Sequence, residues 1–267
     1  MTRRYTLLAW TAAVCAYLLI VLGAVVRITG SGMGCGDHWP LCNGHLFPPL
    51  DDIGTVIEWS HRLVAALVSV LVAALAAYAW RLRHPARRIA YLAAGLLVLQ
   101  VLLGAVTVKL ELPPWTVILH LGTAMLLLAT LLVAASPPDH PFFLQPGTMA
   151  LLSLAFVTIL FGALTANLGA AAACTGFPLC NGALWPAGGA LAHVHWTHRL
   201  LAYALAITTA VWAVRAYGWR SKVVLGLVAL QVGVGAATVL LGLPGILQAV
   251  HVAVGAAVWA GVVLATR

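Results

Sequence analysis

Charged side chains are scarce in this sequence. Lysine and arginine together number 14, aspartate and glutamate 6, and charged residues make up 7% of the 267 positions against 63% for hydrophobic ones. Soluble globular domains carry about 25% charged residues, so this composition excludes a soluble domain and indicates an integral membrane protein. Apolar stretches of the roughly 20 residues that a spanning helix needs occur eight times. We therefore predict an all-α fold with eight transmembrane helices, at about residues 5–27, 57–80, 88–110, 115–135, 148–168, 194–216, 221–241 and 245–266.

The net charge of +8 does not indicate a nucleic-acid partner. The cations lie at helix ends and do not form a basic face with interleaved aromatic residues. In an eight-helix topology ten of the 14 fall on one side of the membrane. The positive-inside rule therefore predicts that both termini are cytoplasmic, in a multi-pass protein of the inner or plasma membrane surrounded by lipid. The cations near the outer side are Arg27, Arg62, Lys109 and Arg199.

The cysteine spacing lacks the usual metal and covalent cofactor motifs. The sequence has neither a C-x2-C pair typical of zinc sites nor the C-x-x-C-H motif of covalent heme attachment. Cys35 and Cys42 lie in one predicted outer loop, and Cys174 and Cys180 in another. Disulfides persist in the oxidising outer compartment, so we predict one local disulfide in each loop. Cys15 lies mid-helix and is expected only to pack.

The second half of the chain repeats features of the first. The motif Glu-Trp-Ser-His-Arg-Leu at 58–63 recurs as Trp-Thr-His-Arg-Leu at 196–200, an offset of 137, and later motifs match at an offset of 131. Repetition at fixed spacing indicates duplicated structural units. We predict two tandem four-helix units related by internal duplication, 1–135 and 148–267, joined by a proline-rich cytoplasmic linker at 136–147.

Four histidines lie at equivalent positions in these units: His61, His120, His198 and His251. At 1.5 Å rise per helical residue, the two histidines of each unit lie at similar depths below the outer membrane surface. A lone histidine of this kind would be interpreted as a structural one, but the repetition favours a shared function. Zinc or copper would need three or four converging ligands. A pair of imidazoles on alternate helices of a bundle instead suits the two axial positions of a heme iron.

These motifs, together with the Gly-Cys-Gly and Trp-Pro-Leu-Cys segments around Cys35 and Cys42, make the chain resemble the heme A synthase family over nearly its whole length. The resemblance implies an oxidoreductase that converts the C8 methyl group of heme O to a formyl group in two steps, giving heme A for cytochrome oxidase. It also implies that the substrate heme O occupies the N-terminal unit and a resident heme b the C-terminal unit.

The two units differ near the histidines. Glu58 lies three residues before His61 and so shares its helix face, whereas His195 occupies the position three before His198. Arg27 and Lys109 have the uncharged counterparts Ala166 and Leu240. Oxidation of a methyl group needs a group that accepts a proton or stabilises positive charge. We therefore hypothesise that Glu58 is the catalytic carboxylate; the alternative is that it only pairs with Arg27 or Arg62.

Several roles stay open at this stage. Arg62 and Arg199 either pair with heme propionates or extend to the lipid headgroups, and Arg27 and Lys109 are further candidate charge partners. The Cys35–Cys42 pair is either a structural staple or an electron relay. His195 is expected at the outer edge of the second unit, and His84 and His140 are expected to face the cytoplasm.

Other functional classes use the same histidines. The main alternative is a non-catalytic di-heme b-type cytochrome that passes electrons between a quinone and an external acceptor. A heme carrier and a transporter are weaker alternatives, the latter because the repeat is parallel and not inverted. Heme O synthase and an electron acceptor such as a quinone are candidate partners of the enzyme. Co-expression with a source of heme O distinguishes these classes, because only the enzyme makes heme A.

Overall fold

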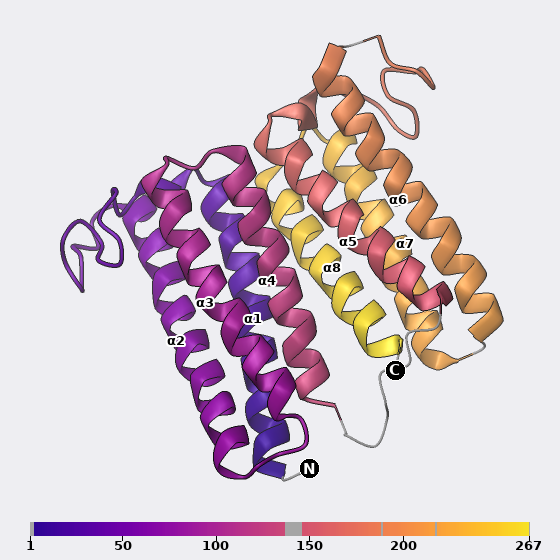
Figure 1. Cartoon of the computed structure of the whole chain (residues 1–267). Helices are drawn as coiled ribbons and strands as arrows, with labels where there is room; N and C mark the ends of the chain where they lie inside the picture. The colour runs from indigo at the N-terminus through magenta and orange to yellow at the C-terminus, as the bar shows by residue number, and fades with distance from the viewer. Residues whose placement is uncertain (1–2, 137–145, 188, 217, 267) are drawn as a thin grey trace. The chain divides into compact units, whose positions relative to one another are not determined.

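The computed structural model describes residues 3–136, 146–187, 189–216 and 218–266 (Figure 1). Within these residues the regular structure is helical, and each of the eight long helices is apolar enough to span a membrane. This confirms the predicted all-α membrane fold, with bounds within about five residues of the predicted spans. The helices are α1 (Arg3–Ile28), α2 (Ile53–Arg81), α3 (Arg87–Lys109), α4 (Pro114–Ala134), α5 (Pro146–Asn167), α6 (Gly189–Ala216), α7 (Trp219–Leu240) and α8 (Gly245–Ala265).

The chain divides into two compact units, Met1–Pro141 with α1–α4 and Phe142–Arg267 with α5–α8. The division falls inside the predicted linker 136–147, of which 137–145 lie outside the described residues. His140 belongs to that segment, so its predicted exposure lies outside the described residues too.

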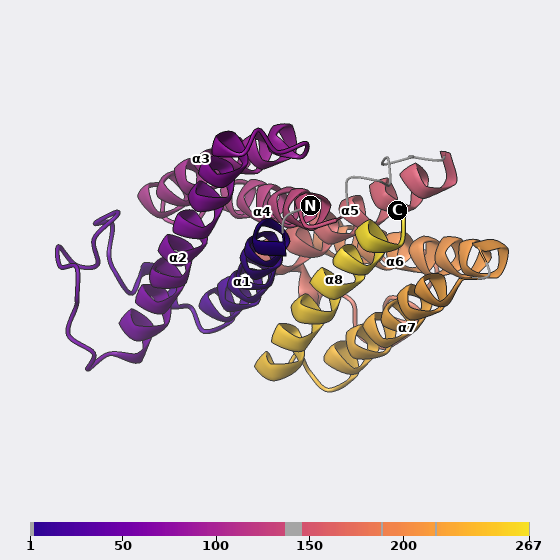
Figure 2. The same cartoon turned by 90° about the horizontal axis from the view of Figure 1, so that it is seen from below.

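Each unit is a four-helix bundle made of two helical hairpins. In the first unit α1 packs on α2 and α3 on α4, and the hairpins meet where α1 contacts α4 and α2 contacts α3. Figure 2 shows α1 between α2 and α4. In the second unit α5 packs on α6 and α7 on α8, with α6 against α7 and α5 against α8. A histidine on α2 and one on α4, or on α6 and α8, therefore project from different hairpins of one bundle.

A loop that contains two cysteines follows the first helix of each unit. Each loop begins with a 3-10 turn, Ser31–Met33 or Ala170–Ala172. The two predicted disulfides are formed, Cys35–Cys42 in the first loop and Cys174–Cys180 in the second. All four cysteines are at most 2% exposed, so the sulfur atoms are shielded beneath the loops they close.

The first loop ends at an N-terminal cap of α2. The Asp52 carboxylate accepts hydrogen bonds from the Thr55 backbone N–H at 2.6 Å and from its hydroxyl at 2.9 Å. These bonds stabilise the ionised form, so the pKa of Asp52 lies below its ordinary value. Thr55 also donates its hydroxyl to the carbonyl of Gly34 at 2.8 Å, and this contact ties the disulfide loop to the start of α2.

His84 lies at the other end of the first unit, between α2 and α3. The sequence-based expectation of a solvent-facing side chain is wrong, because the residue is only 5% exposed and its ring stacks on Tyr5 with centroids 3.9 Å apart. The backbone N–H of Ala86 donates to its Nδ1 at 3.1 Å. Burial lowers the pKa of His84 below its ordinary value.

Candidate functional site

Each of the four histidines packs against a glycine on the preceding helix of its own hairpin. If that glycine carried a Cβ atom, the atom would lie only 2.9–3.2 Å from Cε1 of the imidazole. Any larger residue would therefore push the ring away from the helix. The pairs are His61 on Gly23, His120 on Gly104, His198 on Gly162 and His251 on Gly235. We call these four contacts the glycine seats.

The rings are only half-buried, but the Nδ1 atom of each is buried and has no hydrogen-bond partner among the described residues. The Nδ1 atom of each ring is thus enclosed by protein, although each histidine as a whole is only half-buried. Histidines that bind a metal through Nε2 commonly have Nδ1 turned toward a helix backbone or a carboxylate. This arrangement fits a ligand that approaches from the Nε2 side.

The two histidines of the second unit face one another. The ring centroids of His198 and His251 lie 6.5 Å apart, with the ring planes at 83°. Two imidazoles bound to one iron through bonds of about 2 Å have centroids about 6 Å apart, so this spacing fits a bis-histidine heme. In the first unit His61 and His120 are close enough to interact electrostatically. Among the described residues no group of three or more His, Cys, Asp or Glu side chains converges as a metal cluster would require.

A glutamine contacts one histidine of each pair. Gln100 Nε2 lies 3.1 Å from Nε2 of His120, and Gln231 Nε2 lies 3.2 Å from Nε2 of His251. Each glutamine lies four residues before the glycine that seats the same histidine. The Oε1 atom of each is buried without a partner in the described part of the chain.

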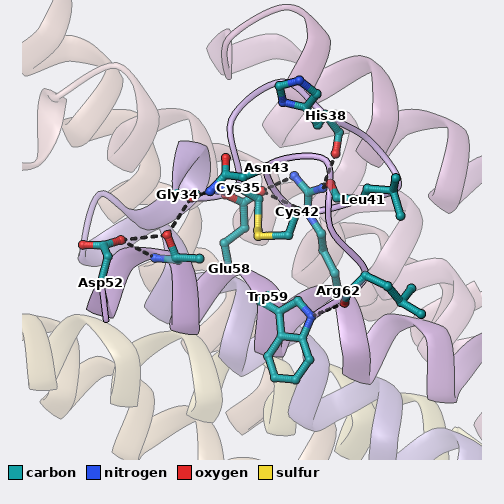
Figure 3. Close-up of a disulfide and its surroundings, with 12 residues drawn as sticks. Gly34, Cys35, His38, Leu41, Cys42, Asn43, Asp52, Glu58, Trp59 and Arg62 are labelled. Carbon is teal, nitrogen blue, oxygen red and sulfur yellow. Dashed lines mark hydrogen bonds and ion pairs between the residues drawn. A yellow bond between two sulfur atoms is a disulfide. The ribbon is translucent and has the colours of Figure 1, made fainter. Parts of the chain in front are cut away.

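Glu58 and Arg62 hold the first disulfide loop over the outer end of the bundle (Figure 3). Glu58 is 3% exposed; its Oε1 accepts hydrogen bonds from Nε and a terminal nitrogen of Arg62, and its Oε2 accepts the Cys35 backbone N–H at 2.8 Å. The other terminal nitrogen of Arg62 donates to the carbonyls of His38 at 3.0 Å and Leu41 at 2.6 Å. The carboxylate of Glu58 thus connects Arg62 to the backbone of the loop through charge-assisted hydrogen bonds.

Arg199 holds the second loop in the same way. Its terminal nitrogens donate at 2.9 Å to the carbonyls of Gly176, Leu179 and Cys174. Its Nε donates at 3.2 Å to Nε2 of His195, whose Nδ1 lies 3.1 Å from the Ala170 carbonyl. Because Nε2 of His195 accepts a hydrogen bond, the proton of the neutral ring lies on Nδ1, which donates to Ala170. We call the Arg62 and Arg199 arrangements the arginine clamps.

The arginine clamps differ from the roles that the sequence suggests. Most N–H donors of Arg62 and Arg199 bond to loop carbonyls and to the residue four positions earlier. His195 is 5% exposed, so it does not lie at an accessible outer edge. Glu58 does pair with Arg62, as one alternative expected.

The other predicted charge partners lie at the periphery. Lys109 is exposed and pairs with Asp37 of the first loop at 3.4 Å. Arg27 is half-buried in the last turn of α1. Trp59 donates its indole N–H to the Leu46 carbonyl at 3.1 Å, so it supports the loop.

Comparisons with known proteins identify the family of the chain. A family model described as cytochrome oxidase assembly protein matches residues 6–263. The chain belongs to this family. It is 36% identical over 250 residues to the heme A synthase of Bacillus licheniformis, covering 83% of this chain and 81% of that protein. The heme A synthase of Halalkalibacterium halodurans is 32% identical over 248 residues, 84% of this chain and 83% of the relative. The heme A synthase of Symbiobacterium thermophilum is 34% identical over 217 residues, which cover 73% of this chain and 70% of that protein.

The sequence alone did not predict the contacts of the glycine seats, the two glutamines and the arginine clamps. The glycines and glutamines did give a signal, because Gly104 and Gln100 recur as Gly235 and Gln231 at the offset that relates His120 to His251. The clamps gave none, since their acceptors are backbone carbonyls whose positions depend on how each loop folds.

Proposed function

We propose that this chain is a heme A synthase, an oxidoreductase that converts the C8 methyl group of heme O to a formyl group and so supplies heme A to cytochrome oxidase. Membership of the cytochrome oxidase assembly protein family and the relatives that carry the name heme A synthase support the proposal. The structural observation that carries it is the facing histidine pair of the second unit, with centroids 6.5 Å apart. That pair fits a heme iron and leaves no need for another metal.

In this proposal His61 and His120 hold the substrate heme O in the N-terminal unit, and His198 and His251 hold a heme b in the C-terminal unit. A bound heme supplies one-electron oxidation and reduction. The residues of the chain would fix its position, because each imidazole lies against a glycine of its neighbouring helix and its buried Nδ1 has no hydrogen-bond partner among the described residues. The two histidines of each unit would thereby hold a heme iron between helices of different hairpins.

Glu58 is the proposed catalytic carboxylate, and the second arginine clamp supports this assignment. In that clamp the neutral ring of His195 accepts the hydrogen bond of Arg199, so a clamp does not need a carboxylate. A carboxylate in the first unit therefore has a further purpose. Glu58 lies one turn from His61 on α2 and accepts hydrogen bonds from Arg62 and the Cys35 amide. An anion at that position stabilises positive charge that develops on a substrate carbon or accepts its proton.

The proposal places the protein in the inner or plasma membrane with both termini in the cytoplasm, following the distribution of its cations. The histidine pairs then lie toward the outer surface of the membrane. Heme O synthase as the source of substrate, and an electron acceptor such as a quinone, are the proposed partners.

Co-expression with a heme O synthase in a host that lacks heme A tests the proposed function. Extracted pigments are then identified by mass. Accumulation of heme A is expected with this chain and not with heme O synthase alone. Bound heme b without conversion of heme O would overturn the proposal in favour of a di-heme cytochrome that only transfers electrons.

A further inference from the structure

We propose that Gln100 and Gln231 are positioning residues that hold one histidine of each pair before heme binds and must release it to the iron. The inference rests on the proposed heme-binding function. It concerns the order in which the two histidines of a pair become available to bind iron. Neither family membership nor the presence of the histidines determines that order.

The two glutamines make the same contact in both units. In each, the side-chain amide nitrogen lies within 3.2 Å of Nε2 of a histidine 20 residues later. Nε2 is the nitrogen that faces away from the glycine seat, since the buried Nδ1 edge lies against the helix. The glutamine therefore contacts Nε2, the atom through which the histidine would bind iron.

The other histidine of each pair has no such contact. The residue four positions before its seating glycine is Leu19 in the first unit and Thr158 in the second. Leucine has no donor, and the Thr158 hydroxyl donates instead to the Leu154 carbonyl at 2.7 Å. Each pair thus combines one histidine without a glutamine contact, His61 or His198, with one whose Nε2 contacts a glutamine amide.

The bond also selects the form of the histidine. When the glutamine amide donates to Nε2, the ring proton lies on Nδ1, which is the tautomer that leaves the Nε2 lone pair for a metal. The same lone pair cannot serve the amide and the iron together, so heme binding must break the hydrogen bond. A net hydrogen-bond contribution of about 0.5–1.5 kcal/mol corresponds to a change of roughly two- to tenfold in a rate or equilibrium constant.

Stopped-flow mixing of heme-free protein with ferric heme b tests this. The spectral change of bis-histidine ligation is followed for the wild type, Gln100→Leu and Gln231→Leu. Leucine keeps the side-chain volume but removes the donor, so ligation should become about two- to tenfold faster in the altered unit. Gln100→Glu and Gln231→Glu should slow it, because a carboxylate accepts a hydrogen bond from Nε2–H and so favours the tautomer whose Nε2 has no lone pair for iron. The neighbouring Leu99→Ala and Leu230→Ala variants, at residues 46% and 52% exposed, serve as matched controls.

Opposite effects of leucine and glutamate at the same position, with unchanged controls and normal thermal stability, would support the inference. Unchanged rates, or equal slowing by both substitutions, would overturn it while leaving the proposed function intact. A wild-type protein that binds heme b without any bis-histidine spectrum would overturn both.

Discussion

Arg199 donates from Nε to Nε2 of His195 at 3.2 Å, where the first unit has Arg62 bonded to the carboxylate of Glu58. Both residues lie four positions before their arginine, and both arginines bond to the carbonyls of a disulfide loop. The loop-holding function is thus common to both units, whereas the negative charge belongs to one.

Replacing Glu58 by histidine copies the second clamp into the first unit. We expect Glu58→His to keep the loop in place and heme bound but to stop heme A formation, because the anion next to His61 is lost. Glu58→Gln should behave in the same way. Heme A and total heme are measured on the extracted pigment. The control is His195→Gln, which alters the matching position of the second unit and retains an acceptor for Arg199. This variant should still form heme A. An active Glu58→Gln enzyme would refute the catalytic role of Glu58.

Arg199 is 6% exposed and uses three of its nitrogens in the second clamp. Lysine cannot reproduce this fork of donors. We expect Arg199→Lys to lower the free energy of unfolding by about 2 kcal/mol or more, since several buried carbonyls lose their donor. Thermal unfolding in detergent measures the change. Arg215→Lys, at an exposed position near the end of the same helix, should have little effect.

The glycine seats predict steric effects that depend on position. A Cβ at Gly162 would lie 2.9 Å from the His198 ring, whereas at Gly226 of α7 it would meet no atom within 4 Å. Gly162→Ala should therefore displace His198 and weaken or alter the heme b spectrum, at a cost of about 1–3 kcal/mol for overpacking. Gly226→Ala should leave the absorption spectrum unchanged. Equal spectra for the two variants would exclude the seat as a determinant of ligation.

The two disulfides should differ in their effect on catalysis. Each closes a short loop and is expected to contribute about 2–3 kcal/mol to stability in the chain-entropy model. Only the first loop reaches the proposed catalytic carboxylate, through the Cys35 amide. Replacing Cys35 and Cys42 by serine should therefore stop heme A formation but leave heme bound. Replacing Cys174 and Cys180 by serine should preserve both heme binding and heme A formation. Full turnover without the first disulfide would rule out both an electron relay and a positioning role.

His84 predicts a pH dependence of stability. Burial lowers its pKa in the folded protein below the ordinary value of 6.5, so the unfolded chain binds a proton first as the pH falls. The contribution of His84 to stability is then complete above about pH 6.5 and is lost as the pH falls below it. Melting temperatures measured between about pH 7.5 and 5.5 should decrease. His84→Phe keeps a ring on Tyr5 and should flatten this part of the profile; an identical slope would show that other groups are responsible.

Much of the fold could be predicted because hydropathy dominates in a membrane protein. The stretch predicted at 57–80 lies inside α2 at Ile53–Arg81, and the one at 245–266 nearly matches α8 at Gly245–Ala265. The disulfides followed from spacing and compartment. The helix α2 begins at Ile53, four residues earlier than predicted. The Asp52 cap and its bond to Thr55 extend the helix into the polar loop, which hydropathy does not reveal.

The details of the site depended on contacts that residue types do not reveal. The clamp acceptors at His38 and Leu41 are backbone carbonyls, which every residue has, so nothing in the sequence marks them. Glu58 was noticed because its charge is unusual in a spanning helix, yet its bond to the Cys35 amide depends on the path of a 24-residue connection between α1 and α2, at 29–52.

Each imidazole rests on a glycine of its own helical hairpin, as His61 does on Gly23 and His120 on Gly104. Each hairpin thus contains one complete histidine–glycine contact of its own. The two histidines of the first unit become neighbours only where α1–α2 and α3–α4 meet, across the α1–α4 and α2–α3 contacts. The proposed ligand pair therefore depends on the packing between hairpins, whereas the orientation of each ring depends on the packing within one.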